Sequence, residues 1–200
     1  MNKAELLKCI AETGYNVGFG AKKHFATYDL IEKMPGWIGF ISTAVGILGL
    51  VIDVLSTKLV SAIFVIVGIC GLYISFYDKD KNRYENAGTD LTKLFNELKS
   101  LYFDVKCLPD NLDVSVYQVR LQDIENRYFP LCISKQILFS NWYAHYKFFW
   151  EHQISWIDEQ LKLRFIRDKI PLSLIFLLSA LILGIVVFLS CTTWLQAICA

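Results

Sequence analysis

The chain has 200 residues, of which 54% are hydrophobic and 14% aromatic, and its formal net charge at pH 7 is +1. This near-neutral charge argues against a protein that binds nucleic acid or anionic lipid through a global basic field. The apolar residues fall in three long blocks, whereas a soluble domain of this size disperses them. The sequence therefore predicts an all-α membrane protein.

Residues 1–35 are predicted to form a cytosolic amphipathic helix, because apolar residues recur there at helical spacing. Gly14, Gly18 and Gly20 each cost about 1 kcal/mol relative to alanine in a helix, and we interpret them as sites of close helix–helix packing. A phosphate-binding loop is the alternative, but a preceding strand and Walker or Rossmann spacing are both missing. Pro35 predicts that the helix ends at the membrane surface. The predicted apolar face consists of Leu6, Ile10, Val17, Ala21, Phe25, Tyr28 and Ile31.

Two uncharged blocks, Gly36–Ile52 and Leu59–Tyr77, predict a transmembrane helical hairpin over residues 36–77. The blocks contain 17 and 19 residues, so as helices they span roughly 25–29 Å, close to the ~30 Å hydrocarbon core of a bilayer. The six residues between them permit only a tight antiparallel turn.

Small residues follow one face of each hairpin helix, and such faces let membrane helices approach closely. They either pack the two helices of one hairpin together or meet copies in other subunits and line an oligomeric pore. Asp53, at the mouth, is either a solvated loop residue or one carboxylate of a ring that favours cations. The candidate pore or helix-contact residues are Gly39, Ser42, Gly46, Gly49, Asp53, Ser61, Gly68, Gly71 and Ser75.

Residues 78–169 carry 14 of the 20 basic side chains and are predicted to form a cytosolic helical bundle with residues 1–35. Asp90 is expected to cap a first helix and Pro109 to open a second. A third is expected to run from Pro130 to the next membrane segment, with Lys147–Glu151 and Asp158–Lys162 as solvated pairs. The three predicted apolar faces are Leu91, Leu94, Phe95, Leu98, Leu101 and Tyr102; Val114, Tyr117, Leu121, Ile124 and Tyr128; and Tyr143, Tyr146, Trp150, Ile154, Ile157, Leu161 and Phe165.

A third uncharged block, Ile170–Ser190, predicts a third transmembrane helix, so that residues 170–200 form this helix and a short outer tail. Basic residues are abundant in 1–35 and 78–169 and absent after Lys169, which predicts a cytoplasmic N-terminus and an external C-terminus. The block has its own small residues, and the alternative pore-lining candidates are Ser173, Ala180 and Gly184. Aromatic residues near the block ends suit a membrane interface: Trp37, Tyr73, Tyr77 and Trp194.

The sequence predicts no catalytic, cofactor-binding or metal-binding site, and we do not expect an enzyme. His145 and His152, with Glu159 behind them, lie seven residues apart, about 10 Å along a helix and too far apart to share one ion. The six cysteines show no metal-binding spacing and are interpreted as scattered buried thiols. Only Cys191 and Cys199 could face an oxidising compartment.

The order of helix, membrane hairpin and long cytosolic helical region resembles the SLATT proteins, the SMODS- and SLOG-associating two-transmembrane effectors. Three stretches carry the resemblance, which covers most of residues 1–172: Gly14–Phe25, Trp156–Leu161 and Asp168–Leu172. It implies an effector of bacterial antiphage defence that forms homo-oligomeric pores in the inner membrane and kills or arrests an infected cell, as in abortive infection. The implied trigger is a neighbouring sensor, either a nucleotide-signal synthase or, in this branch, a reverse transcriptase. No direct nucleic-acid site is evident.

Two readings from different functional classes follow. In the first, the protein is an ion-conducting pore whose cytosolic bundle keeps it silent, lined by the hairpin or by the third block. In the second, it is a non-conducting membrane anchor that recruits soluble defence partners. In both readings the lipid bilayer is a partner.

Overall fold

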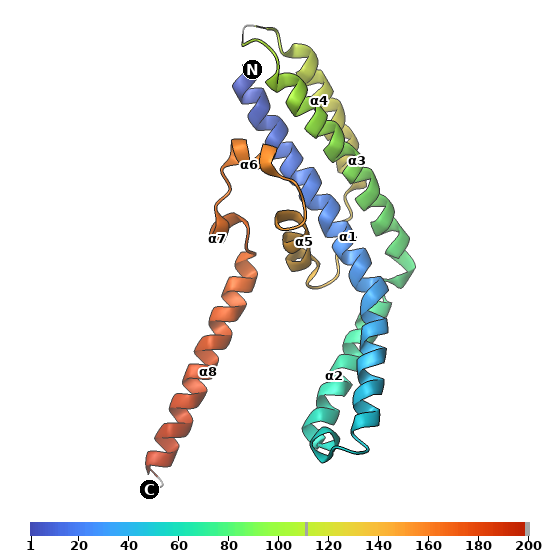
Figure 1. Cartoon of the computed structure of the whole chain (residues 1–200), viewed down its shortest axis with the longest axis vertical. Helices are drawn as coiled ribbons and strands as arrows, with labels where there is room; N and C mark the ends of the chain where they lie inside the picture. Colours follow the sequence, from blue (N-terminus) through green and yellow to red (C-terminus); the bar gives the residue numbers. More distant parts are fainter. Residues whose placement is uncertain (111, 199–200) are drawn as a thin grey trace. The chain divides into compact units, whose positions relative to one another are not determined.

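The computed structural model describes residues 1–110 and 112–198, without the side chains of 188, 189 and 191–198. All of its described regular structure is helical, as predicted (Figure 1). The chain divides into two compact units, Met1–Leu161 and Lys162–Ala200.

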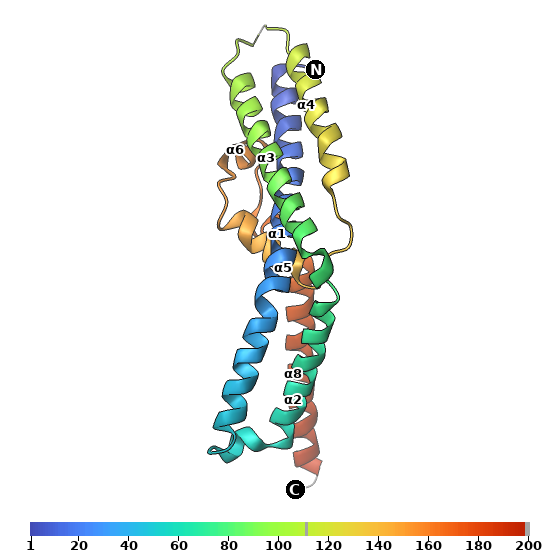
Figure 2. The same cartoon turned by 90° about the vertical axis from the view of Figure 1, so that its right-hand side faces the viewer.

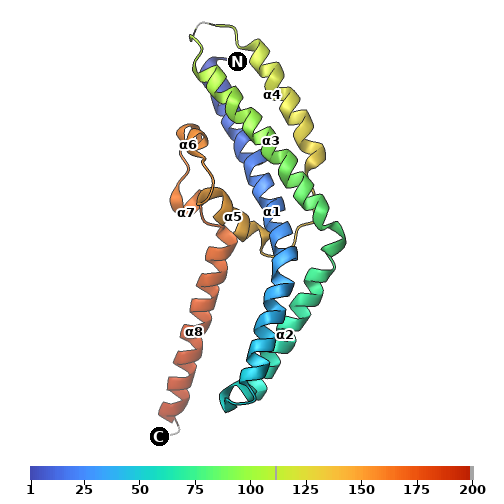
Figure 3. The same ribbon diagram turned by 45° about the vertical axis from the view of Figure 1, so that its right-hand side comes forward.

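Two long helical rods form the frame of the first unit (Figure 2). One rod is α1, Lys3–Leu48. The other consists of α2, Lys58–Ser75, and α3, Lys81–Lys106, which follow one another through the short turn η2, Asp78–Asp80. At the tip of the hairpin, η1, Asp53–Ser56, connects the two rods. The first half of α1 packs along α3, and its second half accompanies α2 (Figure 3).

The predicted end of the first helix at Pro35 is wrong, because α1 continues through Pro35 for 13 further residues, to Leu48. Proline removes one backbone hydrogen bond and strains the preceding turn. A break within the hydrocarbon core would cost more, because it leaves several backbone groups without partners where water is absent. The predicted apolar face is otherwise present, since Leu6, Ile10, Val17, Ala21 and Ile31 are buried.

α3 starts at Lys81, so Asp90 does not cap it and instead pairs with Lys93 at 2.8 Å. The helix extends further toward its N-terminus because Tyr84 and Ala87 continue the buried face. All six residues predicted for this face are buried, which confirms it. The second predicted helix is α4, Ser115–Tyr128, so the predicted start at Pro109 is wrong: the Asp113 carboxylate accepts from the Ser115 amide, just before the helix begins. Leu121 and Ile124 of α4 are buried, as is Val114 immediately before it.

The continuous third helix predicted after Pro130 is wrong. The chain instead forms η3, Phe129–Leu131, then an extended stretch, α5, Ser140–Phe149, and α6, Ser155–Leu161. Phe139, at φ 67°, starts α5 in the left-handed region, which apolar periodicity does not reveal. Because α5 and α6 each pack on α1 separately, no single face serves both helices.

Several residues of the predicted third face therefore lie outside the core. Ile154 and Ile157 are buried, but Trp150 is 65% exposed, and Tyr146 and Phe165 are more than half exposed. The predicted solvated pair of Lys147 with Glu151 is also replaced, because the Lys147 ammonium pairs with the largely buried carboxylate of Asp29 on α1. This ion pair fixes α5 against α1.

The second unit contains α7, Phe165–Asp168, and α8, Leu172–Ile198. Pro171 precedes α8, and its carbonyl accepts hydrogen bonds from Leu174 and Ile175, as expected for a proline at a helix start. The side chains of Cys191 and Trp194, and Cys199 as a whole, lie outside the described residues.

Within the described residues, one helical stretch, Lys58–Lys106, contains a window long and apolar enough to cross a membrane, with a mean hydropathy of 2.5. Only 6% of this window is buried, so the window, which lies in α2, is not the core helix of a soluble domain. The part of α8 whose side chains are described, up to Val187, is also apolar. Three membrane crossings stay a prediction.

Candidate functional site: the hairpin and its base

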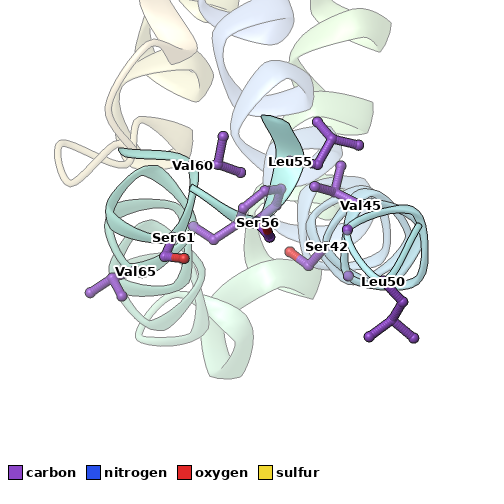
Figure 4. Close-up of a pocket in the computed structure, with 11 residues that line it drawn as sticks. Ser42, Val45, Leu50, Leu55, Ser56, Val60, Ser61 and Val65 are labelled. Atoms are coloured by element: carbon purple, nitrogen blue, oxygen red, sulfur yellow. The ribbon is translucent and has the colours of Figure 1, made fainter. Parts of the chain in front are cut away.

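Near the loop, an open cleft of about 660 Å³ lies between the two hairpin helices (Figure 4). Ser42 of α1 and Ser61 of α2 point toward one another across it. Four predicted contact residues therefore come together in one place, namely Ser42, Gly46, Gly49 and Ser61. The lining consists of Ser42, Val45, Gly46, Gly49, Leu50, Leu55, Ser56, Val60, Ser61, Phe64 and Val65.

Most of the glycine face has no partner within its own hairpin. A Cβ atom added at Gly39, Gly46 or Gly68 would meet no atom within 4 Å. Close packing occurs near the base, where the Ile38 side chain lies 3.8 Å from the Cβ position of Gly71. The helices therefore touch at the base and leave Gly46 open, whereas at Gly49, next to the loop, the Val45 carbonyl lies 3.2 Å from the Cβ position.

The remaining pore candidates lie on exposed surface. Asp53 begins η1 with an exposed side chain, and its carbonyl accepts a hydrogen bond from Ser56 at 2.8 Å. Ser75, at the end of α2, donates to the carbonyl of Leu72. The alternative candidates Ser173, Ala180 and Gly184 are exposed on α8 in the second unit. Their roles in a pore stay predictions.

At the base of the hairpin, residues 132–139, here called the junction loop, are held by three tyrosines of the second rod. The hydroxyl of Tyr84 donates to the carbonyl of Lys135 at 2.6 Å. The Tyr77 hydroxyl approaches the Gln136 carbonyl at 3.4 Å, and the Leu138 amide donates to the Tyr73 hydroxyl at 3.3 Å. A buried apolar cluster lies beneath these contacts: Ile31, Ile74, Tyr77, Tyr84 and Ile137.

On the other side, the junction loop is fixed to α1 by a buried polar network around His24. Gln136 accepts from the Thr27 hydroxyl at 2.5 Å and donates through Nε2 to the Ile133 carbonyl at 2.7 Å. These two contacts orient the Gln136 amide, so that Nε2 faces His24 Nδ1 as a donor at 2.8 Å. Burial lowers the pKa of His24 to about 4, and the nearby Lys23 charge contributes. The ring is therefore neutral at pH 7.

This burial predicts acid sensitivity. His24 binds protons less readily in the folded chain than in the unfolded chain, so unfolding takes up a proton between pH 6.5 and about 4. We expect the free energy of unfolding to fall by about 2 kcal/mol per such histidine between pH 7 and pH 5. Thermal unfolding of the detergent-solubilised protein, followed by tryptophan fluorescence, measures this change.

His24→Gln removes the titrating group and should flatten the profile, although His152, whose pKa burial also lowers to about 4, contributes in the same direction. An equally steep profile in His24→Gln would contradict the assignment.

The first unit thus joins a helical hairpin to a helical bundle. Residues 1–178 match the family model of the SMODS and SLOG-associating 2TM effector domain 6, SLATT_6. The chain belongs to this family. No curated protein and no solved structure matches it. The match and the apolar α2 identify a membrane-associated effector domain of defence systems.

In the bundle of this SLATT domain, two glycines of α1 accommodate aromatic rings. A Cβ atom at Gly14 would lie 2.3 Å from Cη2 of Trp156, and one at Gly18 would lie 2.7 Å from the ring of Phe95. Gly20 is less crowded, with its nearest neighbour at 3.6 Å. The predicted close packing is thus present at Gly14 and Gly18, where side chains from α6 and α3 approach the α1 backbone.

The two histidines weighed as metal ligands, His145 and His152, lie against separate aromatic rings. The ring of His145 lies 4.8 Å from that of Phe19, and the ring of His152 lies 4.7 Å from that of Phe95. Glu159 pairs with Lys106 at 2.7 Å. The described part of the SLATT chain contains no cluster of three metal-ligating side chains.

The interpretation of the cysteines as buried thiols is wrong for three of them. Cys70, Cys107 and Cys132 are exposed free thiols, and Cys9 is partly buried. Cys70 lies on α2 and Cys107 at the end of α3. In a membrane span, exposure means contact with lipid or another helix, which suits a thiol as well as burial does.

Proposed function

We propose that the protein is a pore-forming effector of a bacterial antiphage defence system, which permeabilises the inner membrane when a sensor partner triggers it. The observation that carries the proposal is the open face of small residues on the hairpin. In lipid, helix association depends on close packing and interhelical hydrogen bonds. Small residues of this face that meet nothing among the described residues, such as Gly39, Gly46 and Gly68, therefore suit contact with further copies of the chain in a homo-oligomer.

The polar atoms of the cleft support a conducting assembly. Ser42 and Ser61 face the cleft, and the hydrogen bond from the Ser61 hydroxyl to the Thr57 carbonyl is long, at 3.3 Å. Hydroxyl groups in hydrocarbon need a hydrogen-bond partner or water. Copies arranged around such clefts would bring these hydroxyls to a shared lumen, with Asp53 at its mouth.

The continuous rods suggest how a trigger acts. α1 belongs to both the bundle and the hairpin, so a shift of α1 along α3 moves its membrane half as well. We propose that the bundle holds the pore closed until a sensor protein, or a nucleotide or nucleic-acid signal made by a reverse transcriptase or nucleotidyltransferase, displaces it. The distribution of basic residues supports a cytoplasmic bundle and an external C-terminus.

Gly46→Leu tests the pore. Nothing lies within 4 Å of a Cβ at Gly46, and Gly46 lines the open cleft, so we expect leucine not to reduce insertion or monomer stability. Overpacking at a contact between copies typically costs about 1–3 kcal/mol, enough to weaken an oligomer. We expect normal membrane levels, an altered oligomer distribution on native gels, loss of toxicity on overexpression and loss of ion flux in liposomes.

Ile47→Leu is the matched control, because Ile47 is 62% exposed and lines no part of the cleft. It should conduct and kill like the parent. If Gly46→Leu also assembles and conducts like the parent, the hairpin face is not the pore surface. Absence of ion flux from the parent protein in every triggered state would favour the anchor instead.

A further inference from the structure

A second cavity lies at the base of the hairpin, where three segments meet. It has a volume of about 300 Å³, at the lower end of the range for small-molecule sites. α1 contributes one side, α2 the second and the junction loop the third. The lining consists of Leu30, Met34, Ile38, Val67, Cys70, Tyr73, Ile74, Ile137, Leu138 and Phe139.

The chemistry of this cavity suits a hydrocarbon chain. All its lining side chains are apolar except the Cys70 thiol and the Tyr73 hydroxyl. The Tyr73 hydroxyl is already engaged, because it accepts from the Leu138 amide and contacts the Tyr77 hydroxyl at 3.2 Å. A polar ligand would therefore find few partners, and water would find too few to fill the space favourably.

The cavity is continuous with the membrane-spanning surface of α2. Val67 and Cys70 lie within the uncharged block, and the neighbouring Ile66 and Ile69 are each 60% exposed. At the rim, Leu138 is 62% and Phe139 53% exposed. Apolar side chains so exposed beside a membrane span are stabilised by lipid and not by water. The occupant that this surface favours is a lipid.

The junction loop that lines the cavity also carries a cation. Lys135, two residues before Ile137, is exposed, and its ammonium lies 4.5 Å from the centre of the Tyr77 ring. No ion pair of Lys135 with a carboxylate is found within the described residues, whereas Lys33 and Lys81 are each paired. The Lys135 ammonium can therefore bind a phosphate.

We propose that this cavity binds one acyl chain of a phospholipid from the leaflet next to the helical bundle, with the lipid phosphate at Lys135. The proposal rests on insertion of the hairpin into the bilayer but not on conduction. The bound chain contacts α1, α2 and the junction loop together, so it stabilises the base of the hairpin in the arrangement described above.

Photo-crosslinking tests the site. The purified protein is placed in phosphatidylethanolamine vesicles that contain phosphatidylglycerol with a diazirine in one acyl chain, and the labelled residues are mapped by mass spectrometry. We expect labelling concentrated on Val67, Cys70 and residues 137–139. Cys70→Phe, and separately Val67→Phe, fill the cavity and should lower this labelling to the level at the exposed Ile66.

Ile69→Phe is the control, because it adds the same ring on the exposed side of α2 and should leave the pattern intact. In the parent protein, phosphatidylglycerol probes should label more strongly than phosphatidylcholine probes. Lys135→Ala should keep the label with phosphatidylcholine probes but lose this difference. Gly46→Leu should label normally, so that the pore and the lipid site are judged separately.

Even labelling around α2, or unchanged labelling in both filled variants, would mean ordinary lipid contact only and would overturn the proposal. So would a disulfide between the Cys70 residues of two copies forming in place of the lipid label, because a second chain would then occupy the site.

Discussion

We expect Ile157→Asp to lower the free energy of unfolding by roughly 3–5 kcal/mol, the largest effect of any substitution considered for the bundle. Ile157 is fully buried in α6, which packs on α1. The substitution removes apolar contacts and places a carboxyl group where no charge compensates it. Urea unfolding of the detergent-solubilised protein, followed by tryptophan fluorescence, measures the loss.

Val116→Asp provides the comparison. Val116 is also β-branched but 73% exposed on α4, so the same new carboxylate stays in water and should change the unfolding free energy by no more than about 0.5 kcal/mol. If the two variants lose equal stability, α6 does not pack on α1 as described.

The second large effect is expected for Gly14→Ala. Alanine normally stabilises a helix by about 1 kcal/mol relative to glycine, but here its Cβ would lie 2.3 Å from Cη2 of Trp156. The ring must move, and overpacking of this kind costs typically 1–3 kcal/mol. We therefore expect a lower melting temperature and a changed tryptophan emission spectrum.

Two further variants separate the clash from other causes. Gly20→Ala, with its nearest neighbour at 3.6 Å, should raise stability by about 0.5–1 kcal/mol. Trp156→Leu should make Gly14→Ala harmless, because the atom that clashes is gone; this rescue is a coupling between the two sites. A destabilised double variant that shows no coupling would contradict the packing of Trp156 on Gly14.

The sequence by itself determined the features that depend on local periodicity and composition. Apolar residues at helical spacing identified the buried faces of α1, α3 and α4, because a helix buries one face whatever it packs against. The absence of charge over whole blocks indicated the hairpin, since the bilayer core excludes charge. The order of these segments, together with three local stretches of sequence, indicated the SLATT family, which the match over residues 1–178 then confirmed.

Only the tertiary structure decided where helices end and which surfaces stay open. Pro35 lies inside α1, which continues beyond it along α2, and the left-handed Phe139 separates α5 from the chain before it. The His24 network joins residues more than 100 positions apart. The sequence predicted close contacts at both Gly46 and Gly14. In the structure, no atom lies near the Cβ position of Gly46, whereas Trp156 crowds that of Gly14. The spacing of residues along the chain indicates which face of a helix each one occupies. Whether that face is covered depends on segments distant in the sequence, which spacing does not reveal.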